Sequence, residues 1–230
     1  MRIRIICLLL ISLLLFSCFQ RGPQNGTLNF RTAINEDLAK STGTTSDTCL
    51  VEDLIWRFAS FEVSTGRILA GAPDTLEWVS VYSDTTESRL SEFEFEAELE
   101  PGTYRSIRLA MRNRNWWVVD WEDSLIEVED WNRSSAMYGP EETSYSYYDY
   151  RGCWYCDDGA FENVAPDESA ADILIWNGNT VYVVMNWNMH KLVLNMEDYP
   201  DSVQIRDWLI REGYDMIEWD VTYPPDFSHN

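Results

Sequence analysis

The stretch that most constrains the fold is SEFEFEAELEPG, residues 91–102, in which acidic and apolar residues alternate strictly. The apolar residues at the odd positions 93–99 share one face only if successive side chains point to opposite sides, as in a β-strand. A helix would distribute the same side chains around its axis. The segment therefore predicts a strand with its glutamates in solvent, followed by a turn at Pro101-Gly102.

Strand patterns recur along most of the chain. Apolar and aromatic residues make up 45% of the sequence, with 11 Trp and 12 Tyr, which is enough bulk for a core and excludes disorder of the whole chain. Asn177-Gly178 is a two-residue hairpin signal that favours positive φ. The other segments that we expect to form strands are residues 26–34, 49–67, 76–83, 103–113, 115–131, 171–195 and 215–223. Alternating faces joined by turns predict an antiparallel β-sandwich.

One segment predicts a helix. Residues 200–214 (PDSVQIRDWLIREGY) begin with Asp201 or Ser202 as a cap, carry an apolar stripe, and end at Gly213. The expected fold class is therefore all-β, an antiparallel β-sandwich with one C-terminal α-helix.

The N-terminus predicts export. Arg2 and Arg4 precede an apolar run of about 12 residues, too short for the roughly 20 residues that span a bilayer. The following Leu15-Phe16-Ser17-Cys18 resembles the lipobox of bacterial lipoproteins. That resemblance implies removal of residues 1–17 as a signal peptide, lipidation of Cys18, and anchoring in the outer membrane, facing either the periplasm or the exterior. Residues 18–26 then form a tether, and residues 27–230 a single domain with an irregular insertion at 132–170.

The chain is strongly acidic. Its formal charge is −22, and cleavage after Ser17 would remove two arginines and no acid, changing it to −24. Such a surface repels nucleic acid, so we expect no DNA or RNA partner. Five carboxylates after Cys156 are weakly reminiscent of a calcium site but lack EF-hand spacing, so we expect a solvated turn and no bound cofactor. These are Asp157, Asp158, Glu162, Asp167 and Glu168.

Three segments resemble a family. They are GTLNFRTAI (26–34), LEPGTYRSIRLAM (99–111) and NGNTVYVVMNWNMHKLVLN (177–195). The middle one is similar to the L-x-P-G-x-Y-x-x-I-R-L strand pair of β-sandwich domains on bacterial surface lipoproteins, which are organised like fimbrillin-like and fimbrial-anchor proteins. The resemblance implies a surface β-sandwich of binding or structural type and transfers no catalytic residue. Independently, we expect Tyr104 to be buried with its hydroxyl bonded to backbone, and Arg105 and Arg108 to neutralise neighbouring glutamates across strands.

Three cysteines remain after Cys7 is cleaved off and Cys18 is lipidated. In an oxidising compartment, Cys49, Cys153 and Cys156 predict a structural disulfide, either between Cys153 and Cys156 or between Cys49 and one of them. A thioredoxin-like function is disfavoured because the CxxC lies among aspartates in a loop. Zinc would need Cys49, Cys153, Cys156 and His190 to meet in space.

Aromatic residues provide the ligand-binding candidates. Flat rings beside Asp and Asn suit stacking on sugars, although the same rings could pack as a small satellite core. The candidates are Trp116, Tyr147, Tyr148, Tyr150, Trp154 and Tyr155. Catalysis is not indicated, because carboxylate pairs such as those in 120–131 arise by chance among 39 acids. We expect a non-catalytic surface binding or adhesion-type module; the alternatives are a carbohydrate-binding protein of a glycan-uptake system and, less favoured, a hydrolase using paired carboxylates.

Overall fold

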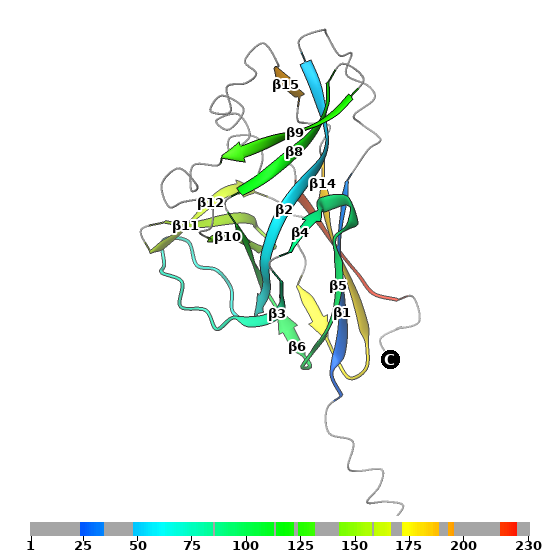
Figure 1. Cartoon of the computed structure of the whole chain (residues 1–230). Coiled ribbons are helices and arrows are strands. Elements are labelled where there is room, and N and C mark those ends of the chain that lie inside the picture. The colour runs from blue at the N-terminus through cyan, green and yellow to red at the C-terminus, as the bar shows by residue number, and fades with distance from the viewer. Residues whose placement is uncertain are drawn as a thin grey trace, which may run out of the picture.

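A computed structural model provides the structure of the chain. It describes residues 24–34, 48–84, 86–112, 114–121, 124–131, 143–157, 159–166, 172–188, 193–195 and 217–224. Within these residues the fold is all-β, with sheets packed against each other (Figure 1). The helix predicted at 200–214 lies outside the described residues.

The described strands follow one another with one short 3₁₀ turn, η2. Their bounds are β1 Gly26–Ile34, β2 Thr48–Ser64, β3 Val79–Ser83, β4 Glu87–Arg89, η2 Leu90–Glu92, β5 Glu94–Leu99, β6 Gly102–Tyr104, β7 Ser106–Arg112, β8 Arg114–Trp121, β9 Ser124–Trp131, β10 Thr143–Asp149, β11 Gly152–Asp157, β12 Ala160–Pro166, β13 Ile173–Ile175, β14 Thr180–Trp187, β15 Val193–Asn195 and β16 Ile217–Thr222.

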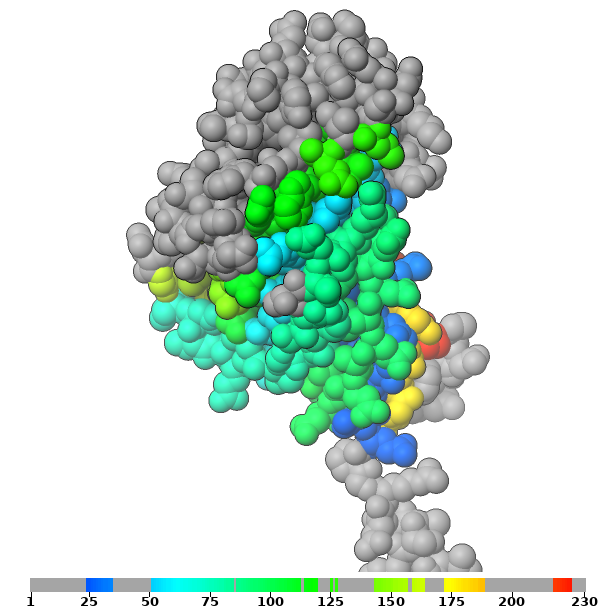
Figure 2. Space-filling view, viewed as in Figure 1, coloured from blue at the N-terminus to red at the C-terminus, as the bar shows by residue number. Residues whose placement is uncertain are grey.

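A four-stranded sheet has the order β16-β14-β1-β5. β5 and β16 are antiparallel to their neighbours, but β1 and β14 run parallel, with Thr27 opposite Thr180 and Ile34 opposite Trp187. The expectation of antiparallel pairing throughout is therefore wrong at this central pair. In the space-filling view, β1 (blue), β5 (green) and β14 (yellow) contribute to one surface (Figure 2).

A larger sheet of ten strands has the main order β12-β11-β10-β7-β2-β8-β9, with β3, β4 and β15 also paired to β2. The 17-residue β2 connects the two halves of this sheet because β7 pairs with its C-terminal part and β8 with its N-terminal part. Register shifts within β2 mark bulges, which let one long strand bend between partners.

Aromatic side chains fill the space between the two sheets. Phe30 of β1 lies 4.8 Å from Phe61 of β2, and Trp219 of β16 lies 5.0 Å from Tyr148 of β10, measured between ring centroids. All four rings are buried. These contacts join strands far apart in sequence, so the alternating inward residues of each sheet form one core.

The structure of single turns is predicted better than that of the insertion. Gly178 has a φ of +70°, as the Asn-Gly turn requires, and Tyr104 donates its hydroxyl to the Glu100 carbonyl at 2.9 Å. The strands on either side of the Asn-Gly turn do not form the expected hairpin, because β13 pairs with β6 whereas β14 pairs with β1 and β16. By contrast, the insertion expected to be irregular contains β10, β11 and β12, three antiparallel strands that extend the large sheet. Its Tyr-, Ser- and Gly-rich composition is typical of loops, but its rings alternate between the two faces of a sheet.

Candidate functional site

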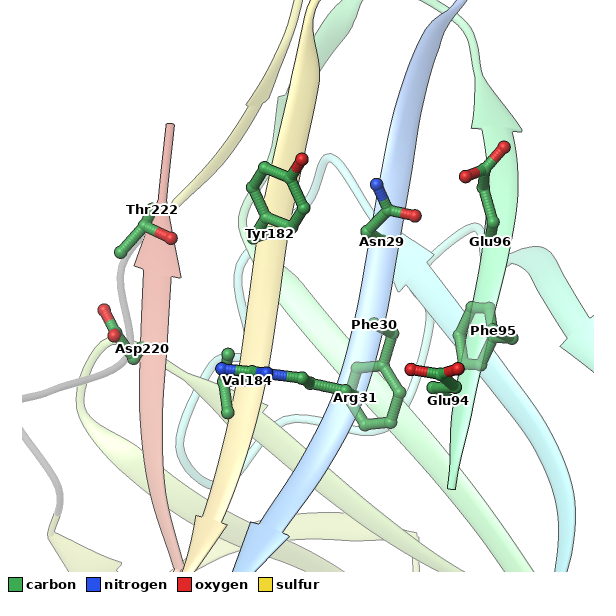
Figure 3. Close-up of a pocket in the computed structure, with 10 residues that line it drawn as sticks. All are labelled: Asn29, Phe30, Arg31, Glu94, Phe95, Glu96, Tyr182, Val184, Asp220 and Thr222. Atoms are coloured by element: carbon green, nitrogen blue, oxygen red, sulfur yellow. The ribbon is translucent and has the colours of Figure 1, made fainter. Parts of the chain in front are cut away.

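A groove crosses the outer face of the four-stranded sheet, on the side away from the core (Figure 3). It encloses about 680 Å³, within the usual range for small-ligand sites. All four strands of the sheet contribute to its lining. The lining residues are Asn29, Phe30, Arg31, Glu94, Phe95, Glu96, Tyr182, Val184, Asp220 and Thr222.

One row of the groove is centred on Tyr182. Backbone pairing places Tyr182 between Thr222 on β16 and Asn29 on β1, and Asn29 next to Glu96 on β5. Figure 3 shows the four side chains aligned across the strands. Tyr182 is 45% exposed, so its ring is available beside an amide, a hydroxyl and a carboxylate.

The next row is centred on Arg31. Asp220, Val184, Arg31 and Glu94 lie on successive strands in that order. The Arg31 side chain extends from β1 across Val184 of β14 (Figure 3). Within the described residues, neither Arg31 nor Asn29 nor Tyr182 makes a side-chain hydrogen bond or ion pair. Their donors are therefore available to a ligand.

Carboxylates dominate the electrostatics of the groove. Glu94 and Glu96 lie along one side and Asp220 along the other, against the single guanidinium of Arg31. The groove therefore favours neutral or cationic ligands over anions. Glu94 and Asp220 are three strand spacings apart, about 14 Å between backbones. Glycoside hydrolysis uses carboxyl groups roughly 5 to 9.5 Å apart, so these two do not form such a pair across the groove.

The groove residues were missed at the level of sequence. The outward orientation of Glu94 and Glu96 was predictable from their alternation with apolar residues. Nothing local indicated that Arg31 and Tyr182 would be neighbours, because this requires a parallel pairing between strands about 150 residues apart in sequence.

Three of the six aromatic candidates are corrected by their burial. Tyr147, Tyr148 and Trp154 are 6%, 3% and 4% exposed, so none presents a ring face to a ligand. Tyr148 packs on Trp219 in the main core. Tyr147 and Trp154 form a satellite core with Ile68 and Phe161, as the alternative interpretation of these rings predicts.

The other three candidates differ in exposure. Tyr150 is 45% exposed at the β10–β11 turn, whereas Trp116 and Tyr155 are half-buried. The Arg114 guanidinium lies 5.2 Å from the ring centre of Trp116. The structure therefore does not bring the six candidates together into one aromatic site.

The satellite core contains a buried network of polar groups. The Asp149 carboxylate accepts a hydrogen bond from the Trp154 indole at 3.0 Å and from Arg151, whose guanidinium also reaches the Ile68 carbonyl. The Asp149 side chain is fully buried, and its hydrogen bond raises the pKa of Arg151. The network fixes the β10–β11 turn against the loop that follows β2.

Tyr147 has the most strongly shifted pKa in this region. Burial raises the pKa of its phenol to about 12, and the nearby Asp74 carboxylate acts in the same direction, opposed by Arg108. Arg108 also forms an ion pair with Glu62 on the neighbouring strand β2, as predicted, whereas Arg105 pairs with Asp172 and not with a cross-strand glutamate. A phenol with a raised pKa stays protonated at neutral pH, which suits a structural role.

The two cysteines of the CxxC segment both lie on β11. Cys153 joins the main core, whereas Cys156 packs against the satellite core. Residues three apart in a strand point to opposite faces with Cα atoms roughly 10 Å apart, beyond the 7 Å limit for a disulfide. This strand geometry argues against the expected Cys153–Cys156 bridge. The side chain of Cys49 lies outside the described residues, as does Cys18, so a bridge involving Cys49 and the lipidation of Cys18 stay predictions.

The described part of the chain contains neither a metal-binding cluster nor a membrane-spanning helix. No group of three or more His, Cys, Asp or Glu side chains there is placed to hold a metal ion. Of the five calcium candidates, only Glu162 has a described side chain, and it is exposed; His190 is not described. Among the described residues, no helix is long and apolar enough to cross a membrane.

Comparison with known proteins returned no relatives: no family model, curated protein or solved structure matches this chain.

Proposed function

We propose that this chain is a non-catalytic binding module of the bacterial cell envelope, a β-sandwich anchored in the outer membrane through a lipid on Cys18. The observation that carries the binding function is the groove on the outer face of the four-stranded sheet. There Asn29, Arg31 and Tyr182 provide donors and a ring that the described protein residues do not use.

The groove is built on a rigid support. Its residues project from paired strands, and the opposite face of β1 carries Leu28, Phe30 and Thr32, all 5% exposed or less. Side chains on such strands keep their positions better than side chains on loops, so a ligand would find the donors already in place.

A neutral carbohydrate is the second, more specific candidate ligand. The observation that favours it is the Tyr182 ring aligned with Asn29 and Glu96, since a sugar can stack on a ring while its hydroxyls bond planar polar groups. The acidic lining agrees with a neutral sugar and disfavours an acidic one.

The experiment is a binding measurement on the full-length protein in detergent, using neutral oligosaccharides and short lysine-rich peptides. For any ligand that the protein binds, we expect Tyr182→Ala and Arg31→Gln each to lower the affinity at least tenfold. Tyr145→Ala is the matched control, because Tyr145 is 42% exposed but lies on β10 of the other sheet.

Two outcomes would count against this proposal. If Tyr182→Ala binds the ligand with the same affinity as wild type, the groove is not the surface that binds it. Release of shorter sugars from an oligosaccharide, abolished by one Asp or Glu substitution, would favour a hydrolase instead.

A further inference from the structure

A second surface carries the opposite charge to the groove. Arg67 and Arg151 lie beside the Tyr150 ring at the end of the large sheet where β2 ends and β7 begins, and Arg105 joins Arg67 there through Asp172. The guanidinium carbons of Arg67 and Arg151 lie 4.4 and 5.4 Å from the centre of the Tyr150 ring. Arg67 and Arg105 share the carboxylate of Asp172, at 3.1 and 3.8 Å.

These groups are open to solvent. Tyr150 is 45% exposed, and the side chains of Arg67, Arg105 and Arg151 are 37%, 41% and 33% exposed. The buried Asp149 already holds Arg151, so Asp172 is the one exposed carboxylate that pairs with the three guanidinium groups among the described residues. The exposed charges of the cluster therefore sum to a positive value in a chain of net charge −22.

Several donors in the cluster have no acceptor within the described residues. Arg105 uses Nη1 for the Thr65 carbonyl at 3.0 Å, which leaves its Nη2 without a partner. Arg151 binds its acceptors through Nε and Nη2, which leaves Nη1. Arg67 Nη1 also lacks a hydrogen bond, but it is buried, so the unpaired donors that face a ligand are those of Arg105 and Arg151. Unpaired guanidinium donors beside an exposed ring are the features expected of an anion-binding site.

We propose that this cluster, Arg67, Arg105, Tyr150 and Arg151, binds the carboxylate of an acidic saccharide. The planar fork of a guanidinium matches a carboxylate. Arg67 donates from a single nitrogen, Nη2, to both oxygens of Asp172, so a carboxylate can reach this guanidinium from the solvent side. The exposed part of the Tyr150 ring adds contact area for the sugar that carries the charge.

This site goes beyond the function proposed for the groove and shares no residue with it. The groove lies on β16, β14, β1 and β5, whereas the cluster is formed by the segment after β2, the β6–β7 connection and the β10–β11 turn. The groove is acidic and the cluster is basic, so the two surfaces select opposite ligands. At physiological salt, screening over about 8 Å limits repulsion from distant carboxylates.

Calorimetric titration of the full-length protein with trigalacturonate tests the proposal. We expect saturable binding that weakens as salt rises, and no binding of maltotriose, a neutral trisaccharide. Arg67→Gln combined with Arg105→Gln should weaken binding at least tenfold, and Tyr150→Ala severalfold. Arg151 is left intact because it anchors the buried Asp149. An unchanged melting temperature would show that each variant is folded.

Controls separate this site from the groove. Arg31→Gln removes one positive charge from the other sheet, against two in the double variant, and Tyr145→Ala removes a ring that is 42% exposed, against 45% for Tyr150. Both controls should leave the trigalacturonate affinity unchanged. The proposal is overturned if trigalacturonate does not bind, if the double arginine variant binds as wild type does, or if triglutamate binds equally well. If trigalacturonate does not bind but another ligand binds in a way that depends on Tyr182, the arginine site is wrong and the function proposed for the groove still holds.

Discussion

The carboxylate of Asp149 and the indole of Trp154 are joined by a hydrogen bond of 3.0 Å inside the protein, across the β10–β11 hairpin. Asp149 also receives the backbone N–H and the guanidinium of Arg151. One buried acid thereby links the β10–β11 turn, through Arg151, to the Ile68 carbonyl in the segment that follows β2.

Removing that acid should destabilise the fold. Asp149→Ala leaves the Trp154 indole and part of Arg151 buried without an acceptor, and we expect a loss of about 2–4 kcal/mol in the free energy of unfolding. Urea denaturation measures it. Glu162→Ala, an exposed acid on β12 of the same sheet, should change the stability by less than about 0.5 kcal/mol. Equal effects for the two variants would contradict the role of Asp149.

The raised pKa of Tyr147 predicts a loss of stability at high pH. The unfolded phenol ionises near pH 10, whereas the folded one stays protonated to about 12. Its contribution is therefore complete below pH 10 and is lost as the pH rises from 10 to 12, by an amount of about 2 kcal/mol. Unfolding free energies of wild type and Tyr147→Phe across this range measure it. The variant should show the shallower decline; identical slopes would mean that Tyr147 does not titrate as described.

Gly26 should not accept a side chain. A Cβ there would lie 2.4 Å from Asn179 Oδ1 and 2.8 Å from Ile175 Cγ2, so Gly26→Ala should cost about 1–3 kcal/mol. Gly102→Ala is the matched control, because its nearest contact would be 3.9 Å and its φ is not positive. Thermal melts of both variants compare them. A stable Gly26→Ala would contradict the close approach of the β13–β14 turn to β1.

The cysteines allow a chemical test of the strand assignment and of the anchor. A non-reduced peptide map should contain no peptide in which Cys153 is linked to Cys156, because both lie on β11 and their side chains point to opposite faces of that strand. The same map should show acyl chains on Cys18, and Cys18→Ser should release the protein from membranes. A Cys153–Cys156 bridge would contradict β11, and an unmodified Cys18 would contradict the anchor.

Local patterns in the sequence predicted local structure well. The alternation in residues 91–99 predicted β5, although the strand begins only at Glu94 because Leu90–Glu92 form the 3₁₀ turn η2. The Asn-Gly pair predicted the turn at Gly178, and Tyr104 was expected to bond backbone. Each of these features depends on neighbours within a few residues.

Features that depend on distant segments were not predictable in the same way. The parallel pairing of β1 with β14 determines the groove, yet the sequence of neither strand indicates that it pairs with the other. The strands β10–β12 were expected to be irregular because Tyr, Ser, Gly and Asp are common in loops. Tyr147, Trp154 and Phe161 are buried together with Ile68, which the segment after β2 supplies.

Footprinting of tyrosines by hydroxyl radicals tests the central claim, that the groove around Tyr182 is the binding surface. The full-length protein is compared alone and with the oligosaccharide or peptide that it retains. The account predicts that the ligand slows modification of Tyr182, while Tyr145, equally exposed on the other sheet, reacts at an unchanged rate. Modification of Tyr182 at the same rate with and without ligand would contradict it.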